Sequence, residues 1–124
     1  MKHLLLSLGV LLAAGIALGQ PEAYRLRVLA WSCKAFPRGV LVQGMVLNTG
    51  SRPISDLRAN VRVVGPGLRI ATHSAPLADR NLMPGERAFF EVRVPTPFAG
   101  LNRCELWFRN PRLVRIPALI PTPR

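Results

Sequence analysis

The side chains that could carry out catalysis are few and scattered along this chain of 124 residues. His73 is the only histidine besides His3, and its neighbours Thr72 and Ser74 predict an exposed strand position. A hydrolase triad built on His73 would need serine and aspartate partners that nothing in the sequence singles out. The sequence holds no G-x-S-x-G, no H-E-x-x-H and no glycine-rich phosphate loop. We therefore expect no catalytic residue and no enzyme activity.

The remaining donors make a poor metal site. A copper carrier could use His73 with Met83 or Met45, but a blue-copper centre needs two histidines and a cysteine. Among the acidic residues, Glu91 and Glu105 lie beside arginines on expected strands, which favours ion pairing over acid–base work. We expect neither a metal nor another cofactor.

The two cysteines, Cys33 and Cys104, stand 71 positions apart. In an exported chain, a small even number of cysteines favours a disulfide. Such a bridge would close most of the domain into one loop and stabilise it by roughly 4 kcal/mol. The alternative is a pair of free or metal-binding thiols, for which no second ligand lies nearby in the sequence.

The charge balance is strongly basic, with 17 Lys and Arg against 6 Asp and Glu. Without Lys2 the count becomes 16 against 6, a net charge of +10, and 15 of the basic residues are arginine. A surface of this kind attracts nucleic acid, anionic lipid head groups or acidic envelope polymers. The alternative is that arginines simply occupy the solvent face of each strand, or reflect genome composition or adaptation to heat.

Aromatic and basic residues meet near the C-terminus. Four arginines, Arg103, Arg109, Arg112 and Arg115, gather there with Trp107 and Phe108 between them, so a polyanion site is expected in this segment if the chain has one. Trp107, Phe89 and Trp31 fall off the main apolar faces by strand alternation. They could form a contact patch for another envelope protein, or they could pack at the edge of the fold or under the C-terminal tail.

The N-terminus has the three parts of a secretory signal peptide. A positive start, Met1 to His3, precedes an apolar run from Leu4 to Leu18, and small residues lead up to a cleavage site near Gly19-Gln20. The alternative is an uncleaved N-terminal anchor, although the run is short for a membrane span. No cysteine follows the small residues, which argues against a lipid anchor. We expect an exported protein, periplasmic or extracellular, with a signal peptide over residues 1–19.

The elements that would position these residues are strands. Residues 57–63 alternate, with Leu57, Ala59, Val61 and Val63 on one face and Arg58, Asn60 and Arg62 on the other. Gly44 predicts a bulge or a close approach within its strand. About seven strands at spacings of roughly ten residues indicate an antiparallel β-sandwich, over residues 24–31, 40–48, 54–64, 68–74, 87–94, 101–108 and 112–116. The domain is expected over 20–116, followed by a proline-rich, frayed or extended tail over 117–124.

Three stretches carry a family resemblance. They are a V-x-G-x-V-x-N-x-G strand and turn at Val42–Gly50, an alternating strand at Ala59–Val63, and an L-x-P-G-E turn at Leu82–Glu86 that leads to Val92. Over about residues 40–94 the chain resembles the FxLYD family of bacterial exported domains. That resemblance implies an Ig-like sandwich outside the cytoplasm with no established catalytic activity.

Together these patterns predict an exported, all-β, Ig-like module that binds or scaffolds other components of the bacterial envelope without catalysis. The alternative is a basic protein that holds DNA or an acidic envelope polymer through its C-terminal arginines.

Overall fold

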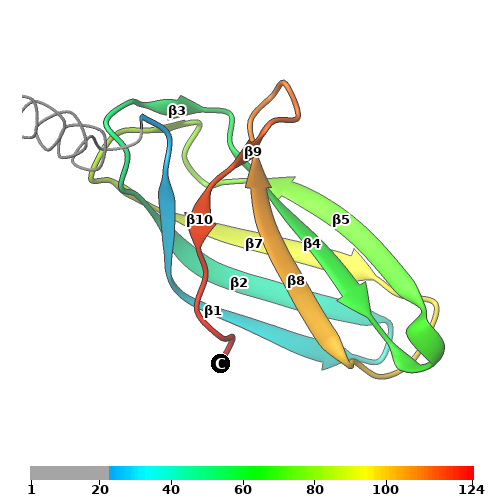
Figure 1. Ribbon diagram of the computed structural model, residues 1–124. Coiled ribbons are helices and arrows are strands. Elements are labelled where there is room, and N and C mark those ends of the chain that lie inside the picture. The colour runs from blue at the N-terminus through cyan, green and yellow to red at the C-terminus, as the bar shows by residue number, and fades with distance from the viewer. Residues whose placement is uncertain (1–22) are drawn as a thin grey trace, which may run out of the picture.

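The computed structural model describes residues 23–124, which are almost entirely β-structure (Figure 1). Six strands have seven residues or more: β1 (Leu26–Phe36), β2 (Gly39–Asn48), β4 (Arg58–Val64), β5 (Ile70–Pro76), β7 (Arg87–Pro95) and β8 (Arg103–Arg109). Four have two residues each: β3 (Ile54–Ser55), β6 (Asn81–Leu82), β9 (Arg115–Ile116) and β10 (Ala118–Leu119). Within residues 23–124 no helix is long and apolar enough to cross a membrane. The predicted signal peptide lies outside the described residues.

The strands form two four-stranded sheets that pack face to face (Figure 1). One sheet has the order β10-β1-β2-β7 and the other the order β5-β4-β8-β9, while β3 and β6 make a separate short pair. All pairings are antiparallel except that of β1 with β10. The predicted all-β sandwich is confirmed. It has ten strands rather than about seven, because the expected strand 54–64 divides into β3 and β4, and the two-residue strands β6 and β10 were not expected.

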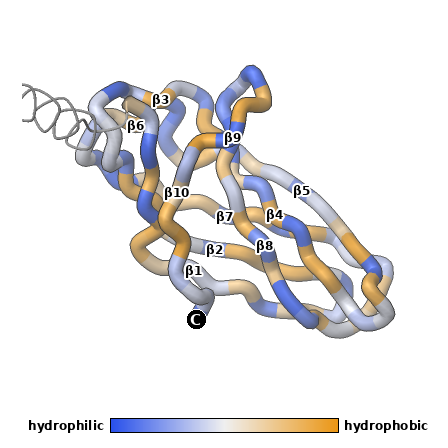
Figure 2. The backbone as a smooth tube through the Cα atoms, in the orientation of Figure 1, coloured by the Kyte–Doolittle hydropathy of each residue, from blue (hydrophilic) through white to orange (hydrophobic). Residues whose placement is uncertain are grey.

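The core lies between the sheets and follows the alternation of the sequence. Along β4 the apolar positions are buried and the polar ones point to solvent, as predicted, and Figure 2 shows the two kinds of residue alternating along the strands. Phe90 of β7 meets Phe108 of β8 across the core, with ring centroids 5.5 Å apart and planes at 85°. This edge-to-face contact joins the two sheets.

Strand β1 departs from the expected pattern, because it continues to Phe36 and contains a bulge. The register against β2 shifts between Val28 and Ala30, so the core side of the strand passes from Val28 to Trp31. Trp31 is therefore buried, with 4% of its surface exposed. The prediction that Trp31 lies off the apolar face was wrong, because a one-residue bulge inverts the orientation of every later side chain in the strand.

Gly44 of β2 lies beside Trp31, where the expected close approach is confirmed. A Cβ atom at Gly44 would lie 2.5 Å from Cζ of Phe90 and 2.7 Å from Cβ of Trp31. The missing side chain makes room for two aromatic residues on the neighbouring strands.

Other strand limits also differ from the expected ones. The segment 54–64 is broken at Asp56, which has φ of 52° and separates β3 from β4. β5 begins only at Ile70, since a 3-10 turn, η1 (Pro66–Leu68), follows β4. The expected strand over 112–116 shortens to β9, because residues 110–114 form the turn of a β8–β9 hairpin.

The C-terminal tail is extended, as expected, but it is docked rather than frayed. After β9 the chain changes sheets at Pro117, and β10 pairs in parallel with the start of β1 (Figure 1). The amide of Leu26 donates to the carbonyl of Pro117 (2.9 Å), and the amide of Arg124 donates to the carbonyl of Trp31 (2.9 Å). Residues 117–124 are thus part of the sandwich and cover the edge of β1.

The disulfide between Cys33 and Cys104 is confirmed. It joins β1 to β8, the strands on the same side of the two sheets, with the Cα atoms 6.6 Å apart. A structural disulfide fits a protein that matures in an oxidising compartment.

Candidate functional site: a basic face around Trp107

The outward face of the β5-β4-β8-β9 sheet carries a row of arginines. Arg109 of β8 lies directly opposite Arg58 of β4 on one side and Arg115 of β9 on the other. The adjacent row, Ala59, Phe108 and Ile116, is buried in the core, so the arginine row points outward. Adjacent strands lie about 4.8 Å apart, and like charges placed directly opposite one another repel.

Trp107 lies beside this row, and three arginines surround its ring. The guanidinium carbons of Arg62, Arg109 and Arg115 lie 5.7, 5.7 and 5.8 Å from its ring centroid. Because these side chains cover the ring, Trp107 is only 9% exposed although it points away from the core. Each contact has cation–π geometry. We call the set Arg58, Asn60, Arg62, Trp107, Arg109 and Arg115 the basic face.

Acidic residues compensate little of this charge. Glu105 lies 3.5 Å from Arg62 and 3.3 Å from Arg103. Within residues 23–124, Arg58, Arg109 and Arg115 form no ion pair, and the other two pairs, Arg80–Asp56 and Arg93–Glu91, lie elsewhere. The expected pairing of Glu91 and Glu105 with arginines is confirmed. The basic face therefore has unneutralised positive charge.

Two buried donors of the basic face also have no acceptor. Neither Nε1 of Trp107 nor Nε of Arg109 has a hydrogen-bond partner within the described chain. Trp107 and Arg115 line a hollow of about 380 Å³ with Ile116 of β9 and with Pro117, Ala118 and Ile120 of the docked tail.

The structure brings together only part of the predicted site. Arg109 and Arg115 surround Trp107, but Arg103 lies at the far end of β8, opposite Val64. Arg112 is exposed in the β8–β9 turn. Phe108 is fully buried in the core and takes no part in the surface.

Phe89 lies on the opposite sheet, so it cannot share one patch with Trp107. It is 43% exposed on the outward face of β7, opposite Met45 of β2, which is 36% exposed. The two side chains make a small apolar pair. The prediction that Trp107 and Phe89 form one contact patch was therefore wrong. The two sheets pack face to face, so the outward residues of β7 and β8 point in opposite directions.

The sequence reasoning missed Arg58, Asn60 and Arg62 as site residues. Alternation along β4 had already placed them on the solvent side, but nothing in the sequence indicated that β4 lies beside β8. A search for outward arginines on every strand, rather than for a local cluster, would have included them.

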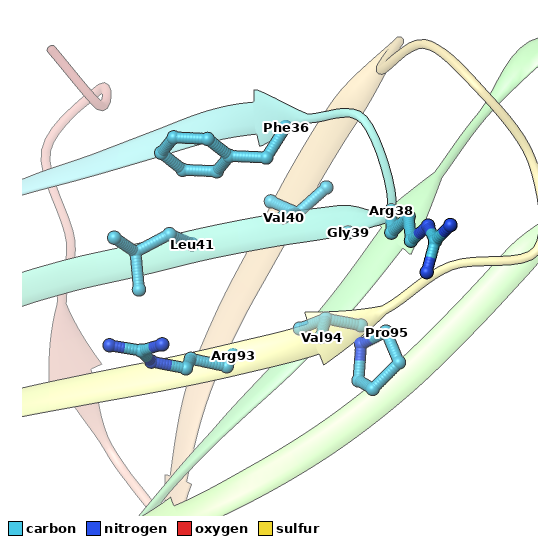
Figure 3. Close-up of a pocket in the computed structure, with 8 residues that line it drawn as sticks. All are labelled: Phe36, Arg38, Gly39, Val40, Leu41, Arg93, Val94 and Pro95. Atoms are coloured by element: carbon cyan, nitrogen blue, oxygen red, sulfur yellow. The ribbon is translucent and has the colours of Figure 1, made fainter.

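A second hollow, of about 440 Å³, lies at the β1–β2 turn (Figure 3). Its lining side chains Phe36, Leu41 and Arg93 come from three adjacent strands and lie in a row across the sheet, with Leu41 directly opposite Arg93. Arg93 is paired with Glu91 at 3.5 Å. His73 lies exposed on β5, as expected, and no group of three His, Cys, Asp or Glu side chains within 23–124 could hold a metal ion.

Comparison with known proteins gives no family. No family model matches the chain, and no curated protein matches it. Among solved structures, the chain is similar to β-glucosidase 3B from Thermotoga neapolitana, determined in complex with glucose, with 20% sequence identity and a TM-score of 0.47. The similarity covers 75% of this chain and 15% of that chain.

Proposed function

We propose that this protein is an exported, non-catalytic, Ig-like binding module of the cell envelope whose ligand is an anionic polymer held on the basic face. The observation that carries the proposal is the row Arg58–Arg109–Arg115, which the sheet register assembles beside Arg62 with a single acidic neighbour, Glu105. Like charges in register cost stability. A ligand that neutralises them offsets that cost.

The residue types favour phosphate, sulfate or carboxylate groups. A guanidinium donates two parallel hydrogen bonds to such an oxyanion, which a lysine cannot do in the same geometry. Single-stranded nucleic acid would in addition need exposed rings on which bases stack, and Trp107 is covered by arginines. An acidic envelope polymer therefore fits better than single-stranded DNA.

The test compares two variants that each lose two positive charges. Arg58→Gln with Arg115→Gln alters the basic face, and Arg27→Gln with Arg87→Gln alters exposed arginines on the outward face of the other sheet. Binding to heparin, as a model polyanion, is measured between about 50 and 200 mM salt, where an interaction of several charges weakens by orders of magnitude. The slope of log affinity against log salt should become less steep by about 2 in the basic-face variant. The control variant should keep the wild-type slope.

Equal losses in the two variants would mean that net charge, not the basic face, attracts the polymer. No retention of the wild-type protein at low salt would refute polyanion binding altogether.

A second candidate is a contact with another envelope protein through Phe89 and Met45. Its support is their exposure side by side on the β10-β1-β2-β7 sheet. In a pull-down from envelope extract, Phe89→Asp should lose a partner that Arg58→Gln retains. Capture of the same proteins by wild type and Phe89→Asp would argue against this contact.

The extracytoplasmic location has its own test. Intact mass of the protein from the envelope fraction should correspond to a chain that begins near Gln20 and holds no free thiol. A mass that includes residues 1–19 would support the uncleaved anchor instead.

A further inference from the structure

The turn between β8 and β9 presents apolar side chains at the end of the sandwich. We call residues 110–114 the hairpin tip. Leu113 is 72% exposed and Val114 is 54% exposed. Leu113 also has φ of 63°, a backbone conformation that leucine rarely adopts. The fold thus holds two apolar side chains in water, one of them in an unfavourable conformation.

Asn110 fixes the shape of the hairpin tip. Its side-chain oxygen accepts hydrogen bonds from the amides of Arg112 (3.0 Å) and Val114 (2.9 Å). Its own amide donates to the carbonyl of Val114 (3.0 Å), and its carbonyl accepts from the amide of Leu113 (2.9 Å). Four hydrogen bonds to one asparagine keep the tip in a single conformation, so its exposed leucine is presented rather than free to fold back.

The hairpin tip combines this apolar surface with positive charge. Arg112 lies within it and Arg115 follows it, both exposed. Asp56 and Asp79 share a hollow with Pro111 of the tip, and Asp56 is paired with Arg80 at 3.1 Å. Apolar side chains that project beyond arginines match the interface of an anionic bilayer, where the former enter the acyl region and the latter meet lipid phosphates.

The hairpin tip lies at the end where the chain enters the domain. Tyr24 shares a hollow of about 490 Å³ with Pro111 and Arg112. Only residues 19–23 separate Tyr24 from the apolar run that ends at Leu18, and five residues span at most about 18 Å. While that run is attached and membrane-bound, this end of the sandwich is the one that can meet the bilayer.

We propose that the hairpin tip docks on the surface of an anionic lipid bilayer, with Leu113 and Val114 entering the interface and Arg112 and Arg115 contacting lipid phosphates. This surface shares Arg115 with the basic face, but its apolar residues Leu113 and Val114 lie outside the basic face, and the proposal does not depend on a soluble polyanion. It orients the sandwich with its long axis away from the membrane.

The test uses the chain from Gln20 to Arg124, because the apolar run would itself bind lipid and the fully buried core of the described residues runs from Leu26 to Ile116. Flotation is measured with vesicles of phosphatidylglycerol and phosphatidylcholine in equal parts and with vesicles of phosphatidylcholine alone. The protein should float with the anionic vesicles only. Leu113→Asp should lower the partition coefficient about tenfold or more, since it removes the leucine side chain that enters the bilayer interface.

Leu68→Asp is the matched control. Leu68 is 80% exposed with φ of 60°, in η1 after the far end of β4, so the substitution makes the same change in charge and hydropathy away from the hairpin tip. It should float like wild type. Leu113→Trp gives a second measurement, a blue shift of fluorescence on anionic vesicles that Leu68→Trp does not show.

Equal flotation of Leu113→Asp and Leu68→Asp, or an unshifted Leu113→Trp spectrum, would overturn the proposal. If wild type binds heparin but does not float with anionic vesicles, the hairpin tip is not a membrane site and the polyanion proposal stands. If wild type floats with anionic vesicles but does not bind heparin, the hairpin tip is a membrane site and the polyanion proposal fails.

Discussion

The indole Nε1 of Trp31 donates a hydrogen bond of 2.6 Å to the carbonyl oxygen of Pro121, 90 positions later in the chain. This contact ties the C-terminal tail to β1, the strand whose register shifts at the bulge after Val28. The tail completes the hydrogen bonding of a buried side chain and covers a sheet edge, so it belongs to the folding unit. An exposed edge would invite pairing with other chains.

Removal of residues 118–124 should therefore destabilise the domain. Trp31 would lose its acceptor and β1 its neighbouring strand, and we expect the free energy of unfolding to fall by about 2 to 3 kcal/mol. Denaturant unfolding followed by circular dichroism measures this. Arg124→Ala, which keeps the backbone hydrogen bond to Trp31, should change stability by less than about 0.5 kcal/mol. A truncated protein as stable as wild type would show that the tail contributes nothing to folding.

The Cys33–Cys104 bridge closes a loop of 71 positions. Its reduction should lower the free energy of unfolding by about 4 kcal/mol on the chain-entropy model. Unfolding curves with and without reductant give the value, and mass analysis after alkylation without reductant should detect no free thiol. An unfolding midpoint that does not move on reduction would contradict the expected stabilisation.

Gly44→Ala should destabilise the core. The added methyl group would approach the Phe90 ring and the backbone oxygen of Ala30 at 2.5 and 2.7 Å. Overpacking of this kind costs about 1 to 3 kcal/mol. The comparison is Gly67→Asn, where no atom lies within 4 Å and asparagine tolerates the left-handed backbone. If the two variants unfold at the same denaturant concentration, Gly44 is not needed for packing.

Asn48 is the one buried polar residue among the described residues. Its side-chain nitrogen donates to the carbonyls of Arg52 and Leu82, each at 2.9 Å, and its oxygen accepts from the amide of Gly50 at 2.9 Å. Asn48→Ala leaves these groups without partners and should cost about 2 to 4 kcal/mol. Asn60→Ala removes a single exposed hydrogen bond, to Arg58, and should be nearly neutral. Similar stabilities of the two variants would argue against Asn48 as a structural centre.

Arg58→Glu should have opposite effects on stability and binding. Glutamate at this position faces Arg109, so repulsion becomes attraction and the free energy of unfolding should rise by about 0.5 kcal/mol at low salt. Heparin affinity should fall in the same variant. Because salt screens surface charges, the stability gain should shrink as salt is added; a gain that is independent of salt would exclude the electrostatic explanation.

The sequence alone determined the class of fold and much of its local structure. Alternation in residues 57–63 and 87–94 specified which side chains enter the core, because a strand has only two faces and burial selects the apolar one. Two cysteines were enough to predict the bridge. Gly44 stood out as a residue with a geometric requirement, and the tertiary structure supplies the neighbours, Phe90 and Trp31, that explain it.

Only the tertiary structure decided which strands are neighbours, and with that the site. Arg58 and Arg109 are 51 positions apart, and no local pattern indicates that they face each other across a sheet. The bulge after Val28 reversed the orientation of Trp31, since one extra residue inverts all later side chains. Strand alternation placed both Phe89 and Trp107 off the apolar faces, but the structure puts them on opposite faces of the sandwich. Strand pairing depends on contacts between distant segments, and a short amphipathic strand can satisfy its own hydrophobic pattern beside several different neighbours.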